Sequence, residues 1–64
     1  MQKSPPVKED EEFNLKIEAI GEKGDGIAKV EGFTIFIPDA KIGDEVKVKI
    51  KKVLRSFAFA EKVE

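Results

Sequence analysis

The sequence predicts an all-β fold, a small five-stranded β-barrel, and two observations carry this prediction. From Phe13 onward, apolar and polar residues alternate with a period of two, the pattern of strands that bury one face. Glycine, proline and aspartate interrupt this alternation at short intervals, as turns between strands do. A two-sheet sandwich would fit the same pattern, but barrel closure removes the exposed strand edges.

The first half of the chain contains three of the expected strands. Phe13 to Ala19 alternates in hydrophobicity and ends at the segment 21–26, whose three glycines and aspartate predict a turn with positive φ. Ile27 to Val30 is a short strand, and Glu31-Gly32 is a two-residue connection typical of a hairpin. Phe33 to Ile37 is rich in β-branched and aromatic residues, which favour the extended conformation.

The second half contains the other two strands, after a loop predicted from Pro38 to Asp44. Glu45 to Leu54 alternates most regularly, with aliphatic residues on one face and lysines on the other. At Lys51-Lys52-Val53 this alternation slips by one residue, which predicts a bulge or bend. The last strand runs from Phe57 to Val63.

Residues 1–12 are predicted to form a flexible acidic tail, so the barrel domain is expected to cover residues 13–64. Ser4-Pro5-Pro6 disfavours both helix and sheet. The acid run Glu9–Glu12 lacks the alternating ligands and the turn glycine of a calcium loop. We interpret the run as a solvated block of like charges.

Composition excludes several kinds of chemistry. The 64 residues include no cysteine and no histidine, so neither thiolate nor imidazole chemistry is available. We therefore expect no metal, no cofactor and no catalytic residues, because so short a chain rarely encloses a site that shifts the pKa of a carboxylate or lysine. With no stretch of about 20 apolar residues and no signal peptide, we expect a soluble, cytoplasmic monomer that does not contact membranes.

The net charge of −1 weighs against a nucleic-acid ligand, but the charges are unevenly distributed. Residues 1–12 and residues 13–40 each carry a net charge of −2. Residues 41–64 carry seven positive side chains against four acidic ones, a net charge of +3. The sequence therefore permits a local basic face on a mildly acidic molecule.

Four short signals follow one another in the order found in TRAM domains. They are a glycine-rich turn leading into a strand, a strand end of the aromatic-valine-proline style, a glycine-acid pair before a basic alternating strand, and a basic residue followed by an aromatic and spaced alanines. In this chain they read Gly24-Asp25-Gly26-Ile27-Ala28-Lys29-Val30, Phe36-Ile37-Pro38, Gly43-Asp44-Glu45-Val46-Lys47-Val48-Lys49-Ile50 and Arg55-Ser56-Phe57-Ala58-Phe59-Ala60-Glu61. The chain beyond the tail thus resembles the TRAM domain over essentially its whole length.

This resemblance implies a fold and a function. TRAM domains are similar to OB-fold barrels and occur as RNA-binding appendages of tRNA-modifying methyltransferases and methylthiotransferases. Free-standing versions are associated with archaea and look like small RNA binders or RNA chaperones, and this chain resembles that stand-alone type. Asp39-Ala40 departs from the family, where a glycine often follows the proline, and so does Phe59, at a position that is often polar.

Strand parity selects candidate aromatic residues for binding. Ala58 and Ala60 share one face of the last strand, and Phe57 and Phe59 share the other with the charged Glu61, which favours an outward position for the two rings. Outward rings could stack on bases, whereas the competing interpretation places them in the core. For Phe36, which shares parity with Thr34, stacking and packing remain equally open, while Phe33 and Phe13 are expected in the core.

Basic residues supply the other candidates. Lys47, Lys49 and Lys51 are spaced roughly 7 Å apart along one strand face, similar to successive phosphates, although each could instead be part of a solubilising stripe. Arg55 is the strongest single candidate, because a guanidinium can both stack on a base and bind a phosphate.

The glycine turn could serve as a turn, as a phosphate contact, or as both. Its exposed amides could bind phosphate with the help of a lysine. The candidates there are Lys23, Gly24 and Gly26.

These residues predict binding of RNA with low sequence specificity, in single-stranded, loop or tRNA-like and rRNA targets, with an RNA-chaperone activity as an extension. The alternative is a small barrel that binds other proteins through exposed Phe57 and Phe59.

Overall fold

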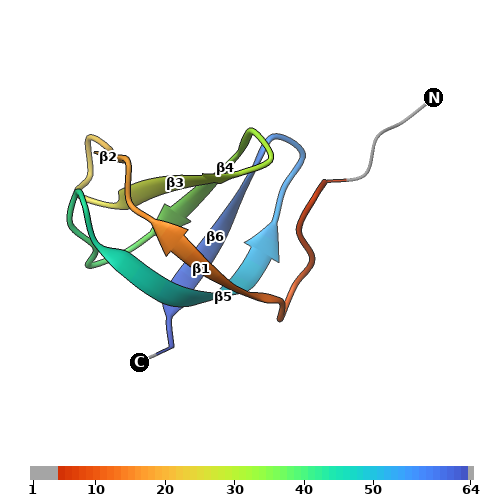
Figure 1. Ribbon diagram of the computed structural model, residues 1–64. Helices are drawn as coiled ribbons and strands as arrows, with labels where there is room; N and C mark the ends of the chain where they lie inside the picture. Colours follow the sequence, from red (N-terminus) through yellow and green to blue (C-terminus); the bar gives the residue numbers. More distant parts are fainter. Residues whose placement is uncertain (1–4, 64) are drawn as a thin grey trace.

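A computed structural model describes residues 5–63, which form six strands and, within that range, no helix that could cross a membrane (Figure 1). The strands are β1 (Glu12–Lys16), β2 (Ala19–Ile20), β3 (Gly26–Val30), β4 (Phe33–Ile37), β5 (Glu45–Val53) and β6 (Phe57–Lys62). These bounds lie within one or two residues of the predicted ones, except that the first predicted strand is divided in two. The all-β prediction is therefore confirmed.

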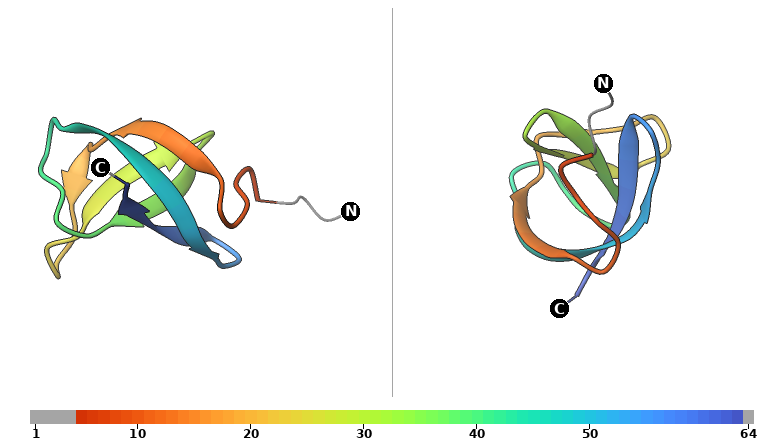
Figure 2. Two further views of the ribbon diagram at one scale, coloured as in Figure 1. Left: turned by 90° about the horizontal axis from the view of Figure 1, so that it is seen from below. Right: turned by 90° about the vertical axis from the view of Figure 1, so that its right-hand side faces the viewer.

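All six strands belong to one sheet, in the order β1-β5-β6-β4-β3-β2. The pair β4–β6 is parallel and the other pairs are antiparallel. Two further views show this sheet curling around on itself (Figure 2).

The two outermost strands of this order, β1 and β2, are the two halves of the first predicted strand. The chain passes from one sheet edge to the other at Ile17 and Glu18. The amide of Ile17 donates to the carbonyl of Asp44 just before β5, and the amide of Glu18 donates to the carbonyl of Ile27 in β3, both at 2.8 Å. One continuous run of sequence thus joins both edges of the sheet, which gives the fold its OB-like barrel character and explains why six strands replace five.

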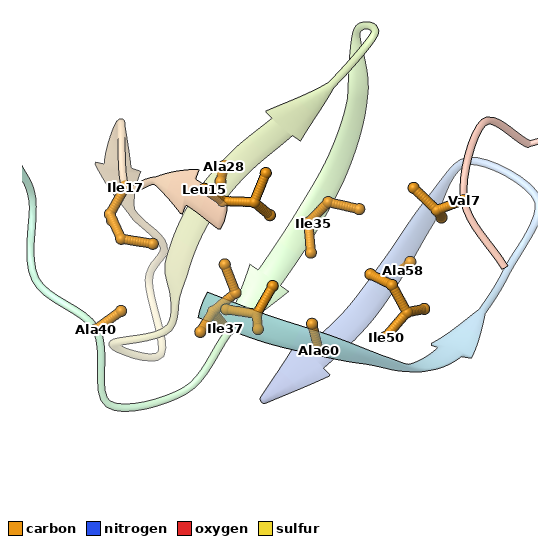
Figure 3. Packing of buried hydrophobic residues seen from close by; sticks show 11 residues of the cluster. Val7, Leu15, Ile17, Ala28, Ile35, Ile37, Ala40, Ile50, Ala58 and Ala60 are labelled. Atoms are coloured by element: carbon orange, nitrogen blue, oxygen red, sulfur yellow. The ribbon is translucent and has the colours of Figure 1, made fainter. Parts of the chain in front are cut away.

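The barrel interior consists of aliphatic and small residues (Figure 3). The buried side chains are Val7, Leu15, Ile17, Ala28, Ile35, Ile37, Ala40, Val48, Ile50, Ala58 and Ala60. Phe13 and Phe33 are partly buried against this cluster, as parity predicts. Three of the four buried alanines are in strands, Ala28 in β3 and Ala58 and Ala60 in β6, because a narrow barrel has little room for larger side chains.

The slip in the alternation of β5 is a β-bulge. The register with β6 shifts between Ile50 and Lys52, so Lys51 is the extra residue. Lys51 and Lys52 are consequently both exposed, whereas Ile50 is buried and Val53 packs against the core. The bulge predicted from the sequence is confirmed.

The N-terminal segment differs from the predicted tail. Val7 is only 2% exposed and belongs to the core, at one end of the cluster, with Ile17 and Ala40 at the other end (Figure 3). From Val7 onward the segment therefore packs on the barrel. Burial of the Val7 side chain removes from water apolar surface that a free tail would leave exposed. Of the rest of the predicted tail, residues 1–4 lie outside the described residues.

Candidate functional site

Phe57 and Phe59 lie on the outer face of β6. The alternate residues Ala58 and Ala60 are almost completely buried, whereas Phe59 is 40% exposed and Phe57 is half-buried. In a strand, successive side chains point to opposite faces, so burial of the alanines requires the phenylalanines to face outward. The predicted orientation of both rings is therefore confirmed.

Phe36 of β4 joins these two rings. It lies directly opposite Phe59 in the parallel pair, and the three ring centroids are 5.4–5.8 Å apart. Phe57 stands nearly perpendicular to both other rings, at 87° and 84°, while Phe36 and Phe59 are inclined by only 35°. We call Phe36, Phe57 and Phe59 the aromatic cluster. Edge-to-face contacts of this kind hold rings in fixed relative positions.

Direct cross-strand partners extend the aromatic cluster into two rows across the sheet. The first row consists of Lys29, Thr34 and Phe57. The second row consists of Ile27, Phe36, Phe59 and Lys52. Both lysines are exposed. The cluster therefore has a lysine in β3 on one side and a lysine in β5 on the other.

Arg55 lies in the turn between β5 and β6, two residues before Phe57. The amide of Leu54 donates to the carbonyl of Phe57 at 2.8 Å, which closes this turn, and Arg55 is exposed at it. Because β4 and β6 are parallel, this turn lies beside the β3–β4 turn (Figure 1). Arg55 and Lys29 are thus near the same end of the aromatic cluster.

The lysines of β5 have a different environment. Within residues 5–63 the ion pairs are Lys47 with Glu12, at 3.3 Å, and Lys51 with Glu61, at 3.8 Å. Lys49 is half-buried and lies opposite Glu61 on one side and Glu12 on the other. The predicted lysine stripe therefore exists, but acidic residues line it on both sides.

The glycine turn separates into exposed and buried parts. Lys23 and Gly24 are exposed, and Gly24 has a φ of 91°, as the turn requires. Gly26 is buried, and a Cβ there would approach the Cβ of Ala40 to 2.7 Å. Close packing therefore requires a glycine at position 26, whereas Lys23 and Gly24 are exposed at the surface.

Sequence reasoning missed three residues that flank the aromatic cluster: Ile27, Lys29 and Lys52. Lys29 and Ile27 could have been assigned to the outer face, since they alternate with the small residue Ala28. Lys52 could not have been assigned to a face in this way, because the bulge changes the face on which it lies. An apolar surface with cations at its margins suits flat, anionic ligands.

Among residues 5–63, no group of three acidic side chains is arranged to hold a metal ion.

Comparison with known proteins identifies related chains. The model of the TRAM domain family matches residues 6–63. An uncharacterised protein of Methanocaldococcus jannaschii is 49% identical over 63 residues, which cover 98% of this chain and 82% of that protein. The solution structure of a conserved Methanococcus maripaludis protein has a TM-score of 0.89 and 43% identity, and the match covers 95% of this chain and 87% of the other.

Two longer relatives contain a similar segment. Translation initiation factor 2 subunit beta of Methanosarcina mazei is 50% identical over 88% of this chain, which corresponds to 28% of the factor. Ribosomal RNA large subunit methyltransferase E of Haloarcula marismortui is 51% identical over 92% of this chain, which corresponds to 22% of the enzyme. This chain thus spans about a quarter of the length of each.

Proposed function

The chain belongs to the TRAM domain family, and from this premise we propose that it binds RNA through the aromatic cluster and has no catalytic centre of its own. The observation that carries the proposal is the position of three mutually contacting phenylalanines on the outside of the barrel. A domain this small needs its large apolar residues for the core. Their outward placement is therefore a cost to stability that binding would explain.

The names of the longer relatives support RNA as the ligand. One is a translation initiation factor subunit and the other a ribosomal RNA methyltransferase. A segment shared by proteins with such different activities is more easily explained by a common ligand than by a common reaction. We propose RNA as that ligand.

The geometry favours unpaired bases. Stacking on Phe59, the most exposed ring, requires a base to leave its own stack, which is easiest in single strands and loops. Every base has a flat face, so stacking gives low sequence specificity. Lys29, Lys52 and Arg55 would contact the phosphates on either side.

We expect micromolar affinity, because few phosphates are neutralised and the molecule has a net charge of −1. The logarithm of the binding constant should fall with the logarithm of salt concentration, with a slope of about −0.7 per neutralised phosphate. Three contacts would give a slope of roughly −2.

Titration of a fluorescent unstructured RNA with wild type and Phe59→Ala tests the proposal. Loss of one stacking platform should weaken binding by about 1–3 kcal/mol, roughly 5- to 150-fold. Ile42→Ala is a matched control, because Ile42 is 64% exposed but lies in the β4–β5 loop, outside the two rows. Absence of wild-type binding at low salt, in a folded protein, would refute RNA binding.

The aromatic cluster would also suit a protein ligand, and Arg55→Ala separates the two possibilities. An RNA ligand should lose affinity with Arg55→Ala as well as with Phe59→Ala, because both phosphate and base contacts contribute. A hydrophobic protein ligand should depend mainly on the phenylalanines.

Low-affinity capture of unpaired bases also leads us to propose an RNA-chaperone activity. A protein that binds open strands but not duplexes shifts a weak hairpin toward the open form by mass action, without an energy source. A molecular beacon with a weak stem should therefore open further as wild-type protein is added, and less with Phe59→Ala. An unchanged beacon at saturating protein would limit the function to binding.

A further inference from the structure

The acidic segment, Glu9–Glu12, lies along the lysine-bearing strand β5. Backbone hydrogen bonds hold it there: the amide of Asp10 donates to the carbonyl of Ile50, and the amide of Ile50 donates to the carbonyl of Glu11, both at 2.8 Å. Two residues thus face one, the arrangement of a β-bulge, and Asp10 adopts the positive φ of 71° that such a bulge accommodates. The acidic segment therefore continues the ladder that pairs β1 with β5.

A turn and a buried valine hold the N-terminal end of the segment in place. The Lys8–Glu11 turn is closed by a bond from the amide of Glu11 to the carbonyl of Lys8 and by one from the amide of Lys8 to Oε1 of Glu11. Val7, immediately before this turn, is buried in the core. The segment is thus anchored at both ends, by Val7 and by β1.

This position places carboxylates beside the lysine stripe. Glu12 forms an ion pair with Lys47 and lies directly opposite Lys49, while Glu61 of β6 pairs with Lys51. The three lysines that would otherwise track a phosphate backbone thus have acidic neighbours supplied by the same chain. Lys29, Lys52 and Arg55 make no ion pair with any residue in the range 5–63.

We propose that the acidic segment acts as a built-in competitor for polyanions, masking Lys47 and Lys49 of β5 so that RNA is confined to the aromatic cluster and its unpaired cations. The acids take the place of phosphates along β5, and they repel any second strand that would approach from that side. The choice of RNA as the excluded ligand rests on the proposed function, whereas the masking itself applies to any polyanion.

The double substitution Glu9→Gln/Glu12→Gln tests the proposal, with Glu22→Gln/Asp39→Asn as the matched control. All four residues are exposed and each double substitution raises the net charge by two, but Glu22 and Asp39 lie in the turns after β2 and β4, outside the acidic segment, and neither forms an ion pair within residues 5–63. Glu11 is left unchanged because its carboxylate closes the Lys8–Glu11 turn. Each variant is titrated with an unstructured RNA and with inorganic polyphosphate, which has the charge of RNA but no bases.

Removal of the two segment acids should tighten binding of both ligands roughly three- to tenfold more than the control substitutions do, the range expected for a few exposed charge pairs. The salt slope should steepen by about 0.7 for each additional phosphate contacted. NMR shifts induced by RNA in the segment variant should spread to Lys47 and Lys49, which stay unperturbed in wild type.

Equal gains in the segment and control variants would overturn the masking proposal, as would wild-type RNA shifts at Lys47 and Lys49. If wild type binds no RNA, the proposed function fails, but the polyphosphate comparison still decides whether the segment masks β5. The two failures are therefore distinguishable.

Discussion

The two faces of the β4–β6 pair carry opposite kinds of side chain. The inner face has Ile35, Ile37 and two alanines, all buried, whereas the outer face has the three rings of the aromatic cluster. Three of the four phenylalanines of these strands are therefore on the outer face, whereas Phe33 packs against the core and two alanines are buried in it. The apolar area removed from water would by itself favour the reverse arrangement, but the narrow interior has no room for the rings.

This difference shows that different physical constraints determine the side chains of the two faces. The inner face is limited by the small volume of the barrel and tolerates little change in side-chain size. The outer face has no neighbouring layer of protein within the described chain, and its three rings contact one another. Substitutions should therefore affect stability on one face and binding on the other, and three predictions test this division.

The largest effect is expected for Ile35→Ala on the inner face. Ile35 is fully buried, so its truncation should lower the free energy of unfolding by about 2–5 kcal/mol, a large part of the total for so small a domain. Phe59→Ala on the outer face should cost roughly 1 kcal/mol, from lost ring contacts. Urea denaturation followed by circular dichroism measures both free energies of unfolding. Similar losses of stability in the two variants would show that the outer face contributes as much to stability as the inner face.

A smaller effect is expected at Gly26. An alanine there would bring its Cβ to 2.7 Å from Ala40 and 3.2 Å from the carbonyl oxygen of Ile37, so Gly26→Ala should lower the free energy of unfolding by about 1–3 kcal/mol. Gly21→Ala is the matched control, since the nearest atom to its Cβ would be 3.6 Å away. The same denaturation assay compares the two variants. An unchanged free energy of unfolding for Gly26→Ala would mean that this end of the barrel expands readily to accept the methyl group.

The smallest effect is expected for Lys29→Ala, beside the aromatic cluster. Loss of one phosphate contact should leave the free energy of unfolding nearly unchanged and reduce the salt slope of RNA binding by about 0.7. Lys16→Ala, on β1 and outside the two rows, should leave the slope unchanged. RNA titrations at several salt concentrations provide the slopes, and equal changes for both lysines would show that only net charge matters.

The fold was largely predictable because alternation and turn residues are local signals. Four of the five predicted strands, the slip in β5 and the outward rings of β6 follow from period-two patterning together with the alanines between the phenylalanines. The break at Ile17 and Glu18 could not be predicted in this way. Those residues keep the alternation, and only their hydrogen bonds to Asp44 and Ile27 divide the strand.

The candidate site was predictable in part, for the same reason. Parity placed Phe57 and Phe59 outside and left Phe36 open, and no local pattern indicates which strands become neighbours. The parallel pairing of β4 with β6 brings the three rings together, and the pairing of β1 with β5 brings acids to the lysines. The burial of Val7 was missed because a single valine beside charged residues has no period to reveal it.

The division of the first strand between two sheet edges has a consequence for how the barrel forms. Residues 12–20 cannot complete their hydrogen bonds until β3 and β5 are both in place, although these strands are separated along the chain by β4 and a loop. Closure thus depends on contacts between residues far apart in sequence, which delays it to a late step of folding. We expect that step to be rate-limiting and the folding transition to be cooperative, since neither edge is complete without the other.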